Sequence, residues 1–452
     1  MPSTHPPVGI FAPRFRLTTI GILTAIVTCA FDQTAVTAVM PHIAHELGDS
    51  DAYSLTFVAV MAASIVGMVS SGLVTDSRGA RFSYTVSAIT LGVGLLAAVF
   101  APNMLVFLIS RAIQGLGTGG LIVAVYAIIA QVYPKALRPK VFAAFAVAWI
   151  MPALVGPGIA GLITTLISWH AVFVLALVTV AASIALLSRA LIKLPHETPT
   201  THPPGSKQLL AAFVLAAAGA GLSLASQTSR ELAPWCILIA LGTALFALRR
   251  LTPHGTLQLR RGVPRLVATR GLVDMFFAAE MYLPLMLAQT YRLGPSLTGI
   301  ALTISGICWL FGSHYQSRFG ARIPTPLVFR VGSACMALGT LWIGVIALGG
   351  GHWGVAVAGW AIAAAGLGFI YPRLSSKPLE LCPPEQTGFT GSALQVTGTT
   401  GTTVMLSLCS LIQVFGSPIT LPSVFVLIAA AALPLLVMWR PAVPEPRKAG
   451  PR

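Results

Sequence analysis

Four charged side chains lie inside long apolar stretches of this sequence, where they could carry out proton chemistry. Asp32 and Arg111 each stand alone in such a stretch, and Asp274 and Glu280 share a third. An acid surrounded by apolar groups retains its proton, whereas one that faces water or a cation releases it. Asp32 could therefore bind a proton in one environment and release it in another. The structural alternative is a neutral Asp32 that is hydrogen-bonded to a neighbouring helix.

The other three charged residues, Arg111, Asp274 and Glu280, allow different roles. Arg111 keeps its charge, so it requires an anion or backbone carbonyls nearby. Glu280 lies about 9 Å deeper in its stretch than Asp274 by helical rise, which favours Glu280 as a second proton site or as a contact for a cationic substrate. Asp274 is equally well explained as a helix cap. The two acids are six residues apart and do not share a helix face.

The elements that must position these residues are membrane-spanning helices. The chain has 56% hydrophobic and 9% charged residues, with a mean hydropathy of +0.84, whereas soluble domains contain roughly a quarter charged residues. This composition excludes a cytosolic enzyme, a disordered protein and a nucleic-acid binder. A crossing helix needs about 20 apolar residues. The predicted helices are 17–41, 53–75, 82–101, 104–131, 141–166, 170–190, 207–227, 233–249, 268–291, 296–317, 326–348, 353–373, 388–415 and 421–440.

These fourteen spans fall into groups of six, two and six. The sequence therefore predicts an all-α integral membrane protein with two six-helix bundles and two extra spans. The first bundle is expected over 1–190, and a linker with the two additional spans over 191–267. The second bundle and a cytoplasmic tail are expected over 268–452.

The distribution of basic residues predicts the orientation. With the N-terminus inside, the outer connections hold only Arg230 and Arg292, and the other bases outside the spans lie on the inner side. This asymmetry follows the positive-inside rule, and it explains the net charge of +16 as a topology signal and a contact with anionic lipid. We expect both termini in the cytoplasm. The first span is predicted to be an uncleaved helix and not a signal peptide.

Two cytoplasmic connections repeat a short pattern. Gly79-Ala80-Arg81 follows the second span, and Gly320-Ala321-Arg322 follows the tenth, 241 residues later. Glycine permits a tight turn, and the bases can bond to the last carbonyls of a helix or to an acid such as Asp76. Simple anchoring of the loops at the inner side is the alternative interpretation.

Four motifs, each on the appropriate span, resemble those of the major facilitator superfamily, specifically its fourteen-span drug–proton antiporter branch. The segment 32–41 is similar to D-x-T-x-V-N-x-x-L-P, and 72–81 to G-x-L-x-D-R-x-G-R-R. The segment 111–117 matches R-x-x-Q-G-x-G, and 156–161 resembles the antiporter signature G-P-x-x-G-G. Departures from these patterns include Thr37, Met40, Ser77 and Ala160.

The resemblance implies two bundles around a cavity that opens alternately to each side, and export of a small amphiphilic compound against inward proton flow. It also implies that Asp32 and Arg111 are close together, so that Arg111 tunes proton binding by Asp32, with Gln114 lining the same cavity. The residues that it implies for the conformational switch are Asp76, Gly79, Arg81, Gly156 and Pro157.

The thirteenth span is unusually polar. Ser392 and Gln395 are expected to line the cavity, with interhelical hydrogen bonding as the equally weighted alternative. Glycines of the fourth span, among them Gly115 and Gly117, are expected to let helices approach closely.

Other functions fit the sequence less well than transport. A primary pump is disfavoured because the sequence has no G-K-[ST] phosphate loop. An intramembrane metalloenzyme has only His42-x-x-His45-Glu46 in its favour, without H-E-x-x-H, and the six scattered cysteines form no metal framework. An exporter of lipids or metabolites, or a facilitator without strict proton exchange, remains an alternative. We expect no enzyme activity, cofactor or metal, and a monomer in the cell membrane whose partners are protons, lipids and the substrate.

Overall fold

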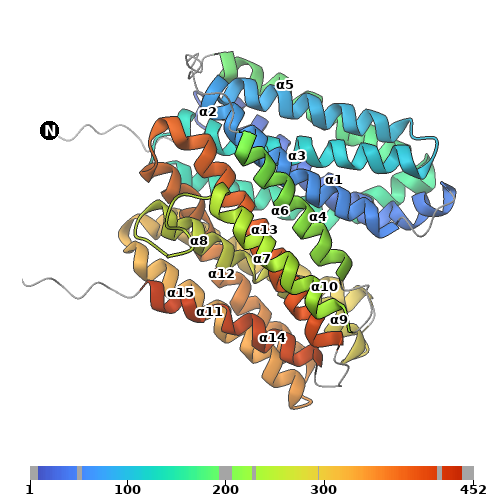
Figure 1. Cartoon of the computed structure of the whole chain (residues 1–452), viewed down its shortest axis with the longest axis vertical. Helices are drawn as coiled ribbons and strands as arrows, with labels where there is room; N and C mark the ends of the chain where they lie inside the picture. The colour runs from blue at the N-terminus through green and yellow to red at the C-terminus, as the bar shows by residue number, and fades with distance from the viewer. Residues whose placement is uncertain are drawn as a thin grey trace, which may run out of the picture. The chain divides into compact units, whose positions relative to one another are not determined.

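The structure is a computed structural model, and it describes residues 9–47, 53–192, 206–225, 231–293, 295–414 and 420–439. Within these ranges every regular element is a helix, and there is no strand (Figure 1). The predicted all-α fold is confirmed over them.

Each of the fourteen predicted stretches is helical over most of its length. The first helices are α1 Arg16–Glu46, α2 Tyr53–Val99, α3 Met104–Val132, α4 Arg138–Leu166, α5 His170–Ile192, α6 Ser206–Ala225 and α7 Ala233–Leu251. The others are α8 Val263–Asp274, α9 Phe277–Gln289, α10 Pro295–Phe319, α11 Thr325–Leu348, α12 Trp353–Leu381, α13 Thr387–Val414, α14 Thr420–Ala430 and α15 Leu433–Met438. Two short 3-10 helices, η1 Gly320–Arg322 and η2 Pro384–Gln386, lie in connections.

The second and third predicted spans form one continuous element, α2, which folds back at Gly79. The backbone there has φ +84° and ψ 159°, a conformation that glycine adopts without steric cost. The fold-back brings Ser71 and Ser83 together, with their hydroxyl oxygens 2.7 Å apart. The glycine of the repeated loop pattern is therefore the turn between two spans.

Two predicted helices are interrupted. Met275 and Phe276 separate α8 from α9 within 268–291, and α14 is separated from α15 within 421–440. Pro434 stands in the first turn of α15, where the missing N–H and fixed φ of proline suit a helix start. Neither Met275 nor Phe276 is a glycine or a proline, so the first break leaves no signal of this kind in the sequence.

Several helices are suited to a membrane by length and composition. Seven described segments are at least 18 residues long and apolar enough to cross a bilayer. They are Arg16–Val36, Thr56–Val99, Met104–Val132, His170–Leu187, Pro234–Leu251, Thr325–Leu348 and Trp353–Leu381. With the all-helical architecture, they define an integral membrane fold.

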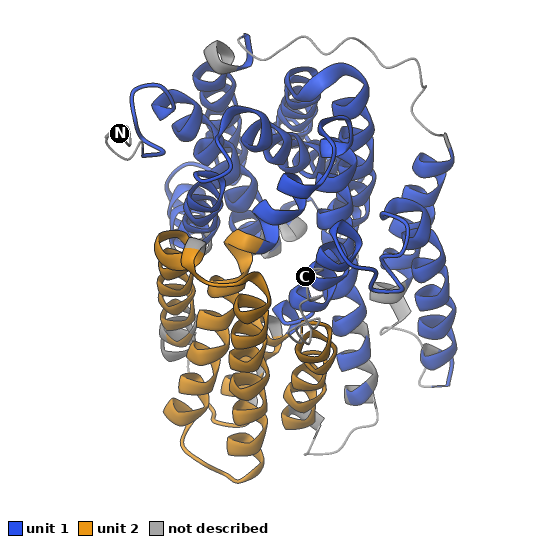
Figure 2. Ribbon diagram, turned by 90° about the vertical axis from the view of Figure 1, so that its left-hand side faces the viewer, with its two compact units in different colours: residues 1–278, 374–417 blue, residues 279–373, 418–452 orange. Residues whose placement is uncertain are grey.

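The chain divides into two compact units, coloured separately in Figure 2. The first unit comprises 1–278 and 374–417, and the second comprises 279–373 and 418–452. This division differs from the boundaries of the expected bundles, because α8 and α13 group with the first helices. The bundle boundaries themselves stay a prediction.

Within the first unit, α3 lies against both halves of α2. A Cβ at Gly115 would overlap the carbonyl oxygen of Val60, and one at Gly117 would overlap the backbone of Leu91. The predicted close approach of helices at the glycines of this span is confirmed. Because no side chain intervenes, α3 is fixed closely between the two halves of α2, and its polar residues have defined neighbours.

The helices predicted as the two additional spans, α6 and α7, also belong to the first unit. They form one buried apolar cluster with the first half of α2, in which Leu215 of α6 and Leu248 of α7 join Ile65 and Val69. Val396 of α13 belongs to the same cluster. The additional spans therefore support both α2 and α13.

Candidate functional site

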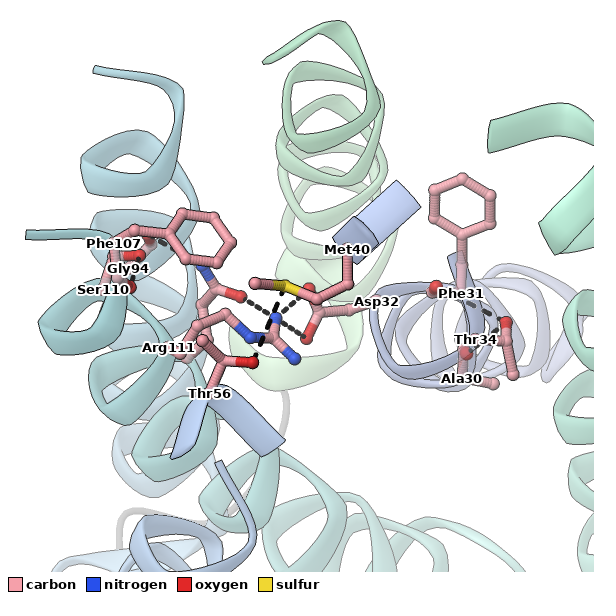
Figure 3. Close-up of polar contacts among 11 residues, drawn as sticks. Ala30, Phe31, Asp32, Thr34, Met40, Thr56, Gly94, Phe107, Ser110 and Arg111 are labelled. Atoms are coloured by element: carbon pink, nitrogen blue, oxygen red, sulfur yellow. Dashed lines mark hydrogen bonds and ion pairs between the residues drawn. The ribbon is translucent and has the colours of Figure 1, made fainter. Parts of the chain in front are cut away.

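The two lone charges of the sequence form a buried ion pair between α1 and α3. Arg111 Nη1 lies 3.1 Å from Asp32 Oδ1 and 3.3 Å from Asp32 Oδ2, and each residue is only 2% exposed. In Figure 3 the guanidinium of Arg111 points toward the carboxylate of Asp32. The structure thus brings together the two residues that the family resemblance placed near each other.

Gln114 completes this site from the next turn of α3. Its Oε1 accepts a hydrogen bond from Arg111 Nη1, and its Nε2 donates to the carbonyl oxygen of Gly94 at 3.1 Å. Gly94 has no side chain at this contact, and a Cβ there would lie 2.7 Å from the Gln114 backbone nitrogen. Gln114 is therefore held by α2 and in turn orients Arg111.

The guanidinium of Arg111 is only partly satisfied. Its Nη1 serves both Asp32 and Gln114, whereas its buried Nε has no hydrogen-bond partner among the described residues. A buried arginine without its counter-ion is costly, since breaking such a pair costs about 3–5 kcal/mol. A proton on Asp32 would remove that counter-ion, so proton binding and the position of Arg111 are linked.

Apolar and weakly polar groups surround the pair. Thr56 Oγ1 donates to the sulfur of Met40 at 3.6 Å (Figure 3), and both residues are buried. Phe107, on the turn of α3 before Arg111, is also fully buried. Such surroundings provide little alternative solvation for either charge.

A second buried ion pair contains Asp274, which the sequence identified, and Arg270, which it did not. Arg270 Nε donates to Asp274 Oδ2 at 2.6 Å, and Arg270 Nη2 donates to Gln395 Oε1 at 3.4 Å. Gln395 thus makes an interhelical hydrogen bond, one of its two predicted roles. Arg270 stands at the end of a basic stretch, so the sequence grouped it with the loop charges at the inner side.

Glu280 lies in the first turn of α9, and its side chain is exposed. It belongs to the second unit, whereas Asp274 belongs to the first. Its predicted role in proton or substrate binding stays a prediction.

The carboxylate of Asp76 binds the start of α13. Its Oδ1 accepts the N–H of Gly388 and its Oδ2 accepts the N–H of Phe389, each at 2.7 Å. The first N–H groups of a helix lack intrahelical acceptors and carry the positive end of the helix dipole. Asp76 therefore caps a helix more than 300 residues away in the sequence.

Glycines make this contact close. A Cβ at Gly388 would overlap the carbonyl oxygen of Gly72, and a Cβ at Gly72 would lie 2.7 Å from Ser392 Cβ. Ser392 is accordingly buried against Gly72 of α2. Arg81, the third residue predicted for the switch in this loop, has an exposed side chain.

Two other predicted switch residues lie in α4. Gly156 is buried, and a Cβ there would lie 2.9 Å from Thr34 Oγ1 of α1. The side chain of Pro157 lies outside the described part of the structure.

The second copy of the repeated loop is held by an arginine that the sequence did not single out. Arg373 of α12 donates from Nη1 to the carbonyl oxygen of Ile323 at 2.7 Å and from Nη2 to that of Gly320. Ser317 stands 241 residues after Asp76, so this copy lacks the carboxylate. The two loops share their glycine and arginine, but only the first has the acid that caps a helix.

The weak metal motif of the sequence forms a simple surface contact. His42 Nε2 lies 3.5 Å from Glu46 Oε2, and both side chains are exposed. Among the described residues there is no group of three or more His, Cys, Asp or Glu side chains that could hold a metal ion.

An all-helical membrane fold with a buried acid–arginine pair between two helices is typical of membrane transporters. The chain belongs to the Major Facilitator Superfamily, since the model of that family matches residues 22–279, more than half of the chain. The family and the transporter relatives described below point to a transporter and not to an enzyme.

Curated relatives agree with this assignment. Multidrug resistance protein 3 of Bacillus subtilis is 30% identical over 158 residues, which are 35% of this chain and 31% of that protein. The probable multidrug-efflux transporter Rv1634 of Mycobacterium tuberculosis is 25% identical over 411 residues, which are 85% of this chain and 84% of that protein. The chain spans about a third of the length of the first curated relatives that it matches.

Solved structures share the fold at low identity. The human organic anion transporter MFSD10 (TETRAN) superposes with a TM-score of 0.73 and 15% identity, covering 95% of this chain and 100% of that one. A bacterial homologue of the iron transporter ferroportin, in an outward-facing state, gives a TM-score of 0.71 and 14% identity, covering 94% and 98%.

Proposed function

We propose that this protein is a proton-coupled antiporter that exports small amphiphilic or drug-like compounds by alternating access. The observation that carries the proposal is the buried pair of Asp32 and Arg111. A charge in the middle of a membrane costs several kcal/mol and usually marks an ion or substrate pathway.

The pair couples proton binding to a change of structure. When Asp32 is ionised, it neutralises Arg111, and the two can stay buried together. When Asp32 takes up a proton, Arg111 retains its charge and must find water or another acceptor. Proton uptake on one side of the membrane and release on the other would then drive the chain between two conformations.

The described contacts support a state that is closed at the cytoplasmic side. Asp76 binds the start of α13, and Tyr126 Oη lies 3.3 Å from Ser375 Oγ of α12. In the predicted orientation, Asp76, Ser375 and the start of α13 lie at the cytoplasmic ends of their spans. These contacts join the first six spans to α12 and α13, so they would have to break for the cavity to open inward.

The class of cargo is inferred from the relatives. Two of the relatives above are described as multidrug resistance or multidrug-efflux proteins, and the apolar surroundings of the Asp32 pair suit amphiphilic compounds. Lipids would suit the same surroundings, so the experiment below compares drugs with lipids as cargo.

Gradient-driven efflux from proteoliposomes tests the proposal. We expect the purified chain to move cationic amphiphilic drugs out of the space that corresponds to the cytoplasm when a proton gradient is imposed, and an uncoupler to abolish this movement. A parallel set with labelled phospholipids separates the cargo classes. Transport that is unaffected by the gradient and the uncoupler would refute proton coupling, and movement of lipids alone would refute the drug assignment.

We further propose that the chain lies in the cell membrane with both termini in the cytoplasm. The positive-inside distribution and the fourteen helical stretches support this topology. Reporter tags fused to each end are expected to report the cytoplasmic side in cells. Termini on opposite sides would rule out an even number of spans.

A further inference from the structure

The second buried ion pair lies at the last turn of α8, directly before the break between α8 and α9. Asp274 is the last residue of α8, and Arg270 one turn earlier donates to its carboxylate at 2.6 Å. The C-terminal end of a helix carries partial negative charge, so a carboxylate there is unfavourable without compensation. Arg270 supplies the compensating charge.

Residues of α13 support the broken form of the helix. A helix end leaves its last carbonyls without intrahelical donors, and Thr402 Oγ1 donates to the main-chain carbonyl oxygen of Asp274 at 2.8 Å. Gly398 lies against the carboxylate of Asp274, which a Cβ at that position would overlap. Thr402 and Gly398 therefore stabilise the form of α8 that ends at Asp274.

The head group of Arg270 also reaches two other helices. Its Nη1 donates to Tyr126 Oη of α3 at 3.5 Å, and its Nη2 donates to Gln395 Oε1 of α13 at 3.4 Å. These contacts tie the end of α8 to α3 and α13. They depend on where Arg270 points, and the carboxylate of Asp274 fixes that direction.

Among the described residues, titratable and charged groups near the pair lie on α3, α8 and α12. Tyr126 is the titratable group from α3 in contact with it, and α13 contains no Asp, Glu, Lys, Arg or His. On α8 itself, Arg265 donates from Nε to the carbonyl oxygen of Leu259. Near the end of α12, Lys377 is paired with Glu380 at 2.9 Å.

We propose that Asp274 is a second proton-binding site and that the proton bound there controls the break between α8 and α9, with Arg270 as the positioning residue. The inference rests on the proposed function, because the same gradient would supply the proton. The step is a simple protonation, in which a proton from the solvent forms an O–H bond on Asp274 and the negative charge that pairs with Arg270 is lost.

The consequence follows from the fixed charge of arginine. Arg270 cannot lose its proton, and it cannot stay buried without an anion. It therefore turns toward water and leaves Tyr126 and Gln395, which frees the end of α8 from α3 and α13. Released from these contacts, the segment around Met275 and Phe276 can change its bend.

Hydrogen–deuterium exchange on the full chain in lipid nanodiscs tests the proposal. After correction for the intrinsic pH dependence of exchange, we expect the amides of 271–280 to open about tenfold more between about pH 8 and pH 5. Asp274→Asn should show the acidic level of opening at both pH values. A pH-independent wild type, or a wild-type response in Asp274→Asn, would overturn the proposal.

The chain offers matched controls for the support from α13. Thr402→Val removes the hydroxyl that caps α8, and we expect opening of 271–280 to rise at both pH values. Thr400→Val removes a hydroxyl that donates only within α13, to Val396 at 2.7 Å, and should leave opening unchanged. Equal effects of the two substitutions would contradict the role of Thr402.

Two further variants cover loss of folding and the dependence on the proposed function. If Asp274→Asn does not fold because Arg270 is left unpaired, the neutral pair Arg270→Gln with Asp274→Asn is measured instead, and we expect pH-independent exchange.

Asp32→Asn should lose coupled efflux and yet retain the wild-type pH response of 271–280. If Asp32→Asn lost the pH response of 271–280, Asp274 would not bind its proton independently of Asp32, and the proposal would be overturned. If Asp32→Asn kept both normal efflux and the pH response, only the role of Asp32 in coupling would be rejected.

Discussion

Replacement of Asp32 by asparagine is expected to reduce gradient-driven efflux to the level of protein-free vesicles. Asparagine has nearly the same shape as aspartate and keeps a hydrogen-bond acceptor for Arg111, but it cannot take up and release a proton. Exchange of labelled for unlabelled substrate without a gradient should persist, because that cycle does not require a proton. Both rates are measured in the same proteoliposomes.

Two further variants separate coupling from folding. Asp32→Asn leaves a buried arginine without its anion, which costs about 3–5 kcal/mol, so the neutral double variant Asp32→Asn with Arg111→Gln serves as a stability control. Asp32→Glu retains the titratable carboxyl and should retain coupled efflux. Undiminished gradient-driven transport by Asp32→Asn would remove this residue from the mechanism.

The sequence was sufficient to single out Asp32 and Arg111 because each charge stands alone in an apolar stretch. Span order could not show that the two side chains touch, since the fold-back of α2 and the packing of α1 on α3 depend on contacts across the first unit. The family resemblance supplied that proximity, and the ion pair at 3.1 Å agrees with it.

Arg270 shows where the sequence was insufficient. It lies four residues from Asp274 but also at the end of a run of basic residues, and the positive-inside rule accounts for such a run without burial. Its burial depends on Gly398 and Gln395 of α13, more than 120 residues away. The break after Asp274 is hidden for the same reason, because α13 stabilises it and neither Met275 nor Phe276 is a proline or a glycine.

The helix cap formed by Asp76 has the same long-range character. The loop motif predicted a switch at Asp76 and Gly79, and the turn at Gly79 follows from glycine itself. The partners of Asp76, however, are backbone N–H groups of Gly388 and Phe389, which carry no side-chain signal. A motif therefore identified the acid, and only the structure identified what it binds.

Replacement of Asp76 by asparagine is expected to weaken closure of the cytoplasmic side. Asparagine keeps one acceptor oxygen but loses the charge and the second acceptor, so one of the two hydrogen bonds to α13 is lost and the other is weakened. Charge-assisted hydrogen bonds contribute about 1.5–3 kcal/mol each, so the population open to the cytoplasm should rise by about tenfold or more. Coupled efflux should fall, because the chain then spends less of its cycle in the state that is closed to the cytoplasm.

Alkylation of Cys382, which follows α12 close to this contact, measures the change. Burial raises the pKa of the Cys382 thiol, and because the thiolate is the reactive form, alkylation from the cytoplasmic side should be slow at neutral pH in the wild type and faster as the pH rises. Asp76→Asn should accelerate it about tenfold at constant pH, as judged by mass spectrometry of the peptide that contains Cys382.

Glu385→Gln is the matched control, because it removes the same charge from the same corner between α12 and α13. Glu385 is exposed, whereas the N–H groups at the start of α13 are bound by Asp76. If both substitutions accelerated alkylation equally, the effect would come from net charge at the inner surface. Acceleration by Asp76→Asn alone would assign it to the cap on α13, and an unchanged rate in Asp76→Asn would show that this cap does not hold the cytoplasmic side closed.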